Sequence, residues 1–273
     1  MNNQLYIRIS KNSLCFAVAD PKAENGVRYE PYVMKSGMSM AANLREAFRE
    51  AVLPAQGYQR AQLLVDMPWM LVPIQEFDAK ECDVLYQHTF SDSAVAVDQR
   101  VVMHNVLSDL NVAVLYAVNR DLKTVVEDHF EDVSYRHVMS FAWSHMLSRS
   151  FTGRFRKLYA YEHEGRLDVF SFDRNRFHFA NVFDVTHYED APFYLMAVWQ
   201  QLAMDNEDDE LHLTFETADA TTADEQQARN SILEAQRRHL RKVYLTNPAV
   251  ELNHARVTQV KGMPFDLMVS LAG

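Results

Sequence analysis

The chain has 273 residues, of which 48% are hydrophobic, so its composition supports a sizeable buried core. Its formal net charge of −10 excludes a generally basic surface of the kind that neutralises nucleic-acid phosphates. The start, MNNQLYIRIS, lacks the apolar stretch of a signal peptide, and no segment reaches the roughly 18 consecutive apolar residues of a membrane span. Because Cys15 and Cys82 each stand alone, we expect free buried thiols and a cytoplasmic protein without membrane contact.

The first half begins with extended segments. Leu5, Ile7 and Ile9 alternate with polar residues, which is the period of a half-buried strand. Ser39 is placed to cap a helix whose apolar side chains share one face. The predicted elements are strands at 5–9, 14–18 and 29–35, a helix at 39–51, and a continuously buried strand at 61–67.

The second half repeats this order after a middle region. In the middle we predict an extended piece at 71–73, a polar helix at 78–90, strands at 100–104 and 111–118, and helices at 121–130 and 138–150. The repeat then contains strands at 158–162, 167–172 and 176–183, a helix from Asp190 to 202, and a strand at 211–215. The chain is predicted to finish with a helix at 224–241 and short strands at 243–245 and 265–269.

The two predicted hairpins align without a gap. LYIRISKNSLCFAVAD (5–20) and LYAYEHEGRLDVFSFD (158–173) share Leu-Tyr at their start, a central Leu and a final Asp. Four identities in sixteen positions are weak evidence by themselves, since two unrelated hairpins can share as many. The same order of five elements, which begins with the hairpin in each half, is stronger evidence, and together they indicate an internal duplication.

This repeated order resembles the duplicated ribonuclease-H-like fold of actin, sugar kinases, heat-shock chaperone ATPases and the pilus protein PilM. The whole chain is similar to DUF3822, a Bacteroidetes family of unknown function in the actin-like ATPase superfamily. The segments that carry the resemblance are the hairpins at 5–20 and 158–173, LLVDMPWMLVPIQEFD (63–78) and NVAVLYAVNRDL (111–122). The resemblance implies an α/β fold of two ribonuclease-H-like subdomains, each a mixed sheet that begins with an antiparallel three-stranded meander and is flanked by helices. We expect the subdomains to cover 1–136 and 137–273, with the last segment as the part that could pack back on the first.

The phosphate loops of that superfamily are the features that this sequence lacks. Active members carry an Asp and a glycine-containing turn between the first two strands of each half, to bind metal and cradle phosphate. The corresponding turns here read Ser10-Lys11-Asn12-Ser13 and His163-Glu164-Gly165, and Thr217-Ala218-Asp219-Ala220 stands where the adenosine site has paired glycines. The whole chain holds only seven glycines, although a backbone that wraps phosphate needs them. We therefore predict degenerate phosphate loops and no ordinary ATP binding.

Other candidate sites have a structural explanation that is simpler than a functional one. His137 and His145 are eight residues apart, too far for a paired metal grip on a helix, and scattered hairpin histidines such as His163 and His178 are usually packing or surface residues. Asp66 ends a buried strand, where it could be catalytic or a turn cap. We predict no metal site and no catalytic residue.

Two surface segments could recognise a partner. The basic stretch SRSFTGRFRK (148–157) could bind a nucleic-acid strand or another anion, although such stretches are more often solvated linkers that balance acidic neighbours. The aromatic segment Tyr188–Trp199 would be a protein-docking face if part of it were exposed, and core if all of it faced the sheet.

The leading hypothesis is a non-catalytic binding or scaffold protein. It would be a pseudo-ATPase that retains the duplicated fold but lacks the residues for ATP binding and hydrolysis. It requires no cofactor, and its partner would be another protein rather than nucleic acid. The alternative is a divergent nucleotide-binding protein. Under that alternative, the phosphate contacts would come from two turns: Ser10, Lys11, Asn12 and Ser13 in the first, Glu164 and Gly165 in the second.

Overall fold

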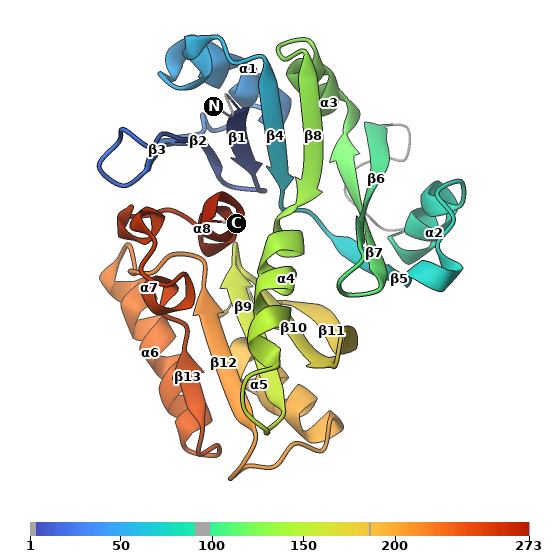
Figure 1. The fold of residues 1–273 in the computed structure, drawn as a ribbon, viewed down its shortest axis with the longest axis vertical. Coiled ribbons are helices and arrows are strands. Elements are labelled where there is room, and N and C mark those ends of the chain that lie inside the picture. The colour runs from blue at the N-terminus through green and yellow to red at the C-terminus, as the bar shows by residue number, and fades with distance from the viewer. Residues whose placement is uncertain (1–3, 91–98, 186, 273) are drawn as a thin grey trace. The chain divides into compact units, whose positions relative to one another are not determined.

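The computed structural model describes residues 4–90, 99–185 and 187–272, and the chain divides into two compact units, Met1–Phe141 and Ala142–Gly273. Each unit is built on its own five-stranded mixed sheet (Figure 1). In the described part of the chain no helix combines the length and the apolar character that crossing a bilayer requires. Both cysteines are buried free thiols, as the sequence predicts.

The sheet of the first unit has the strand order β3-β2-β1-β4-β8. β1 is antiparallel to β2, β2 is antiparallel to β3, and β1 and β8 both run parallel to β4. The strands are β1 (Gln4–Ile9), β2 (Leu14–Ala19), β3 (Val27–Tyr32), β4 (Arg60–Val65) and β8 (Asp132–His137). This is the predicted antiparallel meander, continued by parallel strands on the side of β1.

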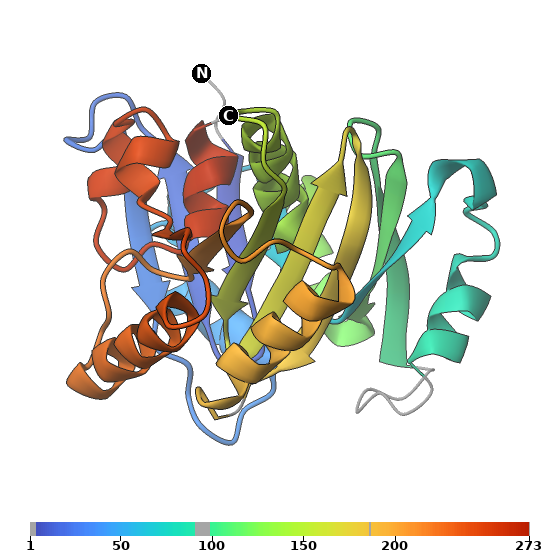
Figure 2. The ribbon, with the colours of Figure 1, turned by 90° about the horizontal axis from the view of Figure 1, so that it is seen from below.

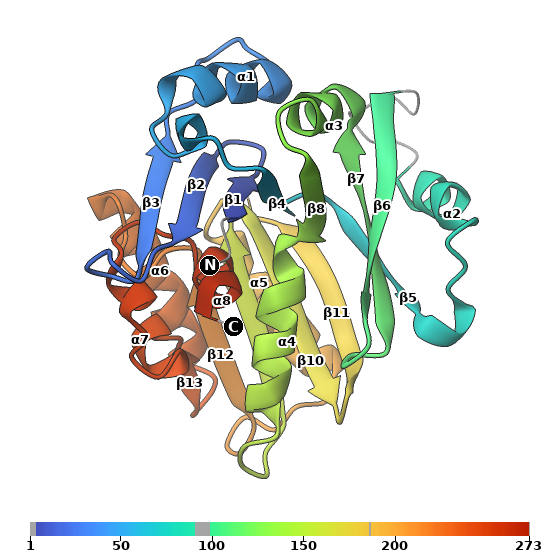
Figure 3. The ribbon, with the colours of Figure 1, turned by 45° about the horizontal axis from the view of Figure 1, so that its top comes forward.

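Helices α1 (Met40–Glu50) and α3 (Arg120–Glu127) cover one face of this sheet, side by side (Figure 3). Their starts follow from local chemistry, because the Ser39 hydroxyl accepts from the Ala42 amide and the Asn119 side-chain Oδ1 accepts from the Asp121 and Leu122 amides. Leu44 and Phe48 of α1 and Leu122 of α3 pack on the alternating apolar residues of β1 and β4. A 3-10 turn, η1 (Pro54–Gln56), leads from α1 to β4.

The middle region forms a second, antiparallel sheet in the first unit, with the order β5-β7-β6. Helix α2 covers one of its faces through a small apolar cluster that includes Cys82, Tyr86 and Leu115 (Figure 3). The elements are β5 (Trp69–Pro73), η2 (Ile74–Glu76), α2 (Cys82–Thr89), β6 (Arg100–Leu107) and β7 (Val112–Asn119).

The second unit repeats the topology of the first sheet, with the order β11-β10-β9-β12-β13 and the same sequence of antiparallel and parallel pairings. Helices α5 and α6 cover one face (Figure 2), and Trp143 of α4 packs on Phe170 at the other. The strands are β9 (Lys157–His163), β10 (Arg166–Asp173), β11 (Arg176–Asp184), β12 (Glu210–Phe215) and β13 (Val243–Leu245). The helices are α4 (Val138–Ser150), α5 (Asp190–Gln201), α6 (Ala223–Arg237), α7 (Pro248–Glu251), η4 (Arg256–Gln259) and α8 (Phe265–Ala272).

The two hairpins have the same register. Ile9 pairs with Leu14 in the first, and Glu162 pairs with Leu167 in the second. These are the pairs that the gap-free alignment of 5–20 with 158–173 places opposite one another. Arg8 and Tyr161 therefore occupy equivalent positions, as do Ser10 and His163.

Two sequence predictions need correction. The predicted strand at 265–269 is wrong, because Phe265–Ala272 is the helix α8. Its apolar run is buried on nearly every side, and a continuous apolar run has no periodicity that separates a helix from a strand. The third strand, predicted at 29–35, ends at Tyr32, because Tyr32 pairs with Leu14, the first residue of β2, and the pairing with β2 stops there.

Candidate functional site

The turn between β1 and β2 is closed on itself by Ser10. The Ser10 hydroxyl accepts from the Ser13 amide at 2.9 Å and from the Asn12 amide at 3.3 Å, and it lies 2.7 Å from the Ser13 hydroxyl. The Ser10 amide donates to the Ser13 carbonyl oxygen at 3.0 Å. A phosphate-binding turn offers backbone N–H groups to the ligand, whereas here a side-chain oxygen already occupies two of them. Ser10 is fully buried and Lys11 is exposed.

A buried charge pair lies directly beneath this turn. Arg8 and Asp66 both have completely buried side chains, with Nη2 and Oδ2 3.7 Å apart, and Arg8 Nη1 donates to the Ser13 hydroxyl at 3.2 Å. Asp66 is the residue that follows β4, and its amide donates to the Ile9 carbonyl oxygen. The carboxylate is therefore held by a cation of its own unit. This contact favours a structural role for Asp66 over the catalytic one that the sequence left open.

The turn between β9 and β10 is tighter and is made differently. Glu164 and Gly165 have φ values of 52° and 73°, the left-handed conformation that a two-residue type I′ hairpin requires at both central positions. Gly165 supplies this conformation without steric cost, while Glu164 adopts it as a strained side-chain-bearing residue. The glycine here serves the turn geometry, and the residue beside it brings a negative charge.

Polar groups are also buried beneath the second turn. His163 Nε2 lies 2.6 Å from Asp168 Oδ2, and both side chains are about 1% exposed. Two residues before His163 on β9, the Tyr161 hydroxyl donates to Asp266 of α8 at 2.7 Å, and the Tyr161 ring stacks on His163. Sequence reasoning missed Asp168 and Asp266. The sequence did contain a sign of both, because each acid interrupts an apolar run. Burying a carboxylate costs little free energy only where a hydrogen-bond or ion-pair partner compensates it.

Burial strongly opposes the ionisation of Glu162. Its side chain lies at the end of β9, and desolvation raises the pKa of Glu162 to about 7, against an opposing effect of His163. Glu216 and Glu225 act in the same direction, whereas Arg229 acts against them. A site that already disfavours one carboxylate disfavours a phosphate still more, because the phosphate carries more negative charge.

The segment after β12, where the superfamily has its adenosine site, is tied to α6. Arg229 Nη1 donates to the Thr217 carbonyl oxygen at 2.9 Å, Nη2 donates to the Thr217 hydroxyl, and the guanidinium lies over the Phe215 ring at 4.7 Å. Glu225 pairs with the same guanidinium. Arg229 is 5% exposed, so this cation is enclosed within the unit and is occupied with holding the segment.

His137, His145 and His163 each contact a different group. His137 is buried, with Nε2 2.9 Å from the Met67 carbonyl oxygen and Nδ1 accepting from the Met139 amide. Those two contacts define the neutral tautomer that donates from Nε2. His145 bonds to Glu251, and His178 lies on β11 at the far end of the hairpin from His163. Within residues 4–90, 99–185 and 187–272, no three His, Cys, Asp or Glu side chains converge in a way that could hold a metal.

The basic stretch at 148–157 is used internally. Arg149 pairs with Glu251 at 2.7 Å, and together with His145 it lowers the pKa of Glu251 to about 2. Arg156 pairs with Asp209 at 2.7 Å, and the buried Lys157 ammonium donates to the Arg149 carbonyl oxygen at 3.1 Å. These cations balance acids and helix ends of their own unit, which supports the structural explanation over nucleic-acid binding.

The six residues singled out for phosphate contact lie in two separate turns, four in the first unit and two in the second. Ser10 and Ser13 are hydrogen-bonded to each other, and Glu164 and Gly165 form the tip of a tight hairpin. Lys11 is the exposed cation among the six residues. Chemically, the turns offer hydroxyls, amides and acids. Neither pairs a placed Asp with an open glycine loop.

The two sheets of the same topology identify the class of protein. This is a duplicated α/β protein with the actin-like ATPase fold. A crystal structure from Bacteroides thetaiotaomicron, described as an actin-like ATPase fold of unknown function, is 22% identical, with a TM-score of 0.78 over 99% of this chain and 95% of that one. PilM in the PilM–PilN type IV pilus biogenesis complex is 10% identical, with a TM-score of 0.52 over 99% of this chain and 97% of that one.

The family itself is shown by the sequence. Residues 1–243 match the model of the protein family of unknown function DUF3822, and the chain belongs to that family. No curated protein matches the chain. The resemblance inferred from the two hairpins is thus confirmed, together with its fold.

Proposed function

We propose that this protein is a catalytically silent actin-like protein that acts by binding a protein partner. The observation that carries the proposal is the closed first turn, in which the Ser10 hydroxyl takes the Ser13 and Asn12 amides that a phosphate would need. The second turn supports it, because the raised pKa of Glu162 and the charge of Glu164 make that position unfavourable for an anion.

Two further observations support a protein partner. PilM, which shares the fold, is seen in a complex with PilN. In this chain α5 turns Leu195, Val198 and Trp199 inward, whereas Phe193 is 70% exposed. A large exposed aromatic ring is the kind of residue that anchors an interface.

Thermal unfolding with nucleotide tests the silent turns. We expect no shift of the unfolding midpoint in millimolar Mg-ATP or Mg-ADP, because a ligand that does not bind the native state cannot stabilise it. A rise of several degrees would favour the divergent nucleotide-binding protein, provided that Lys11→Ser removes the rise. The matched control is Lys22→Ser, which removes an exposed lysine from the next loop.

Crosslinked capture from the native organism tests the partner. Wild-type protein and the Phe193→Ser variant are compared under identical conditions, and Phe151→Ser, which changes another exposed phenylalanine, is the control. We expect a reproducible protein that the Phe193 variant loses and the Phe151 variant keeps. Failure of the wild-type chain to enrich any protein reproducibly would argue against the proposal.

A further inference from the structure

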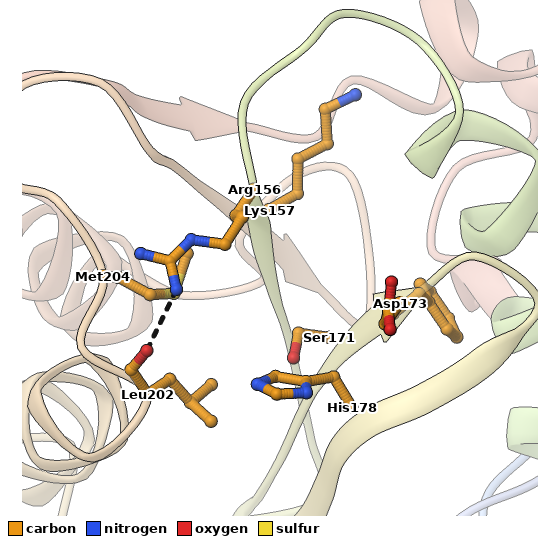
Figure 4. Close-up of a pocket in the computed structure, with 8 residues that line it drawn as sticks. Arg156, Lys157, Ser171, Asp173, His178, Leu202 and Met204 are labelled. Atoms are coloured by element: carbon orange, nitrogen blue, oxygen red, sulfur yellow. Dashed lines mark hydrogen bonds between the residues drawn. The ribbon is translucent and has the colours of Figure 1, made fainter.

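The second unit contains a cavity that lies away from its turn at Glu164 and Gly165. It has a volume of about 210 Å³ and is lined by residues at the start of β9, the end of β10, β11 and the segment that follows α5 (Figure 4). Ser171 lies six residues along β10 from Gly165, which is about 20 Å of extended strand from the hairpin tip. Its volume is below the roughly 300–1,000 Å³ of pockets for drug-sized molecules, so it fits a small metabolite.

A buried hydroxyl without a partner faces this cavity. Ser171 is 5% exposed and lines the cavity, and its Oγ has no hydrogen-bond partner among the described residues. Leaving a buried hydroxyl unsatisfied is unfavourable, and such groups in native proteins call for an explanation. A ligand atom that accepts from this O–H would supply it.

A β-bulge brings an imidazole to the same place. The register of β10 with β11 shifts between Ser171 and Phe172, so that Phe179 faces Ser171 and Phe177 faces Phe172, and His178 is the extra residue. In Figure 4 the His178 ring lies next to the Ser171 side chain. Bulges re-aim side chains and are common beside functional sites.

The cavity has a cationic side and an anionic side. Arg156 donates to the Leu202 and Ala203 carbonyl oxygens and pairs with Asp209, which accounts for three of the five N–H groups of a guanidinium. The neighbouring Lys157 side chain points away, toward the end of α4 (Figure 4). Asp173, two positions beyond Ser171, is exposed and supplies the negative charge.

Between these charges the lining is apolar, with Phe172, Leu202 and Met204 contributing. The spacing of Ser171 and Asp173 along the strand is about 7 Å, which the two charged ends of an α-amino acid span with a hydrogen bond at each end. We propose that this cavity binds a small zwitterion with an apolar side chain, a free amino acid of the leucine or methionine class. The carboxylate accepts from Ser171, His178 and Arg156, and the ammonium group meets Asp173.

Isothermal titration calorimetry with three probes tests the proposal. L-leucine carries both charges, 4-methylpentanoate lacks the ammonium group, and isopentylamine lacks the carboxylate. We expect saturable binding of leucine, at least tenfold weaker binding of 4-methylpentanoate and none of the amine. Absence of binding at about 10 mM leucine would overturn the proposal, and so would equal affinity of leucine and 4-methylpentanoate, since that result would describe a site for simple carboxylates.

Variants locate the binding. Ser171→Ala is expected to weaken leucine binding at least tenfold, and Asp173→Asn to abolish the preference for leucine over 4-methylpentanoate. Asp184→Asn, at the other end of β11, is the control that changes neither. Because the Ser171 hydroxyl has no hydrogen-bond partner in the part of the chain that the structure describes, Ser171→Ala should keep the wild-type unfolding midpoint. Leucine binding that survives both site variants unchanged would place it elsewhere and refute the assignment.

Discussion

The two hairpins have the same register but bury different chemistry at equivalent positions. At one strand position the first unit places Arg8, held by Asp66, and the second places Tyr161, held by Asp266. At the turn, the first unit uses a serine hydroxyl to satisfy its own amides, and the second uses two residues with positive φ. One backbone frame therefore tolerates an arginine–aspartate ion pair or a tyrosine–aspartate hydrogen bond, provided that each buried polar group has a partner.

This difference also bears on the proposed function. In the first turn the Ser10 hydroxyl already accepts from two amides, and in the second turn the neighbouring charge is negative. The first turn is blocked by an internal acceptor, whereas the second is tight and acidic. The predictions below compare the two hairpins, from the largest expected effect to the smallest.

The buried Arg8–Asp66 ion pair should contribute more to the free energy of unfolding than the Tyr161–Asp266 hydrogen bond of the second hairpin. Arg8→Met removes one member of a fully buried pair and is expected to lower the free energy of unfolding by about 3–5 kcal/mol, because Asp66 stays buried with less compensation. Tyr161→Phe removes one hydrogen bond to Asp266 and should cost about 1–2 kcal/mol. Urea unfolding at pH 7 measures both, and equal losses would contradict the difference that we draw between the hairpins.

Glu162 should make the second unit sensitive to pH. Its pKa is raised from 4.5 to about 7, so between these values the folded chain holds a proton that the unfolded chain has lost, and stability falls as pH rises. Glu162→Gln is expected to stabilise the protein by about 2–3 kcal/mol at pH 8 and to have little effect at pH 4.5. Unfolding of both proteins across this range checks the sign, and a Gln variant that is less stable at pH 8 would refute the burial argument.

The closure of the first turn depends on one hydroxyl. Ser10→Ala leaves the Asn12 and Ser13 amides without their acceptor and should lower the free energy of unfolding by about 1–2 kcal/mol. Ser36→Ala, in an exposed turn of the same unit, is the control and should change it by less than about 0.5 kcal/mol. If the Ser10 variant also gained a thermal shift with Mg-ATP, the serine would be the element that excludes phosphate.

The smallest difference concerns backbone conformation. Gly165→Ala should cost about 1–2 kcal/mol although nothing lies within 4 Å of the added Cβ, because φ is 73° and the strain is in the backbone alone. Lys11→Ala, in the first turn, should be close to neutral because no positive φ is required there. Urea unfolding of the two variants is sufficient, and a neutral Gly165→Ala would mean that the second turn relaxes to another type.

The sequence predicted most of the fold because its signals are local. Alternation at Leu5, Ile7 and Ile9, the Ser39 cap and the turn at Gly165 each act within a few residues. The family resemblance implied the antiparallel meander with which each sheet begins. Helix α8 was missed because Phe265–Ala272 is buried on nearly every side, so its apolar residues show no helical period. The separate β5-β7-β6 sheet was not predicted, since strand pairing depends on distant partners.

The candidate site, like the fold, has features that the sequence alone predicts and features that depend on tertiary contacts. The absence of an Asp and a glycine loop in the first turn is a property of the sequence, visible in Ser10-Lys11-Asn12-Ser13 alone. That the Ser10 hydroxyl occupies the amides, that Asp66 finds Arg8, and that Asp266 reaches Tyr161 from a helix more than a hundred residues away were decided by tertiary structure. Residue types limit which chemistry is possible, but hydrogen bonds and burial depend on which groups the folded chain brings within about 3 Å of one another.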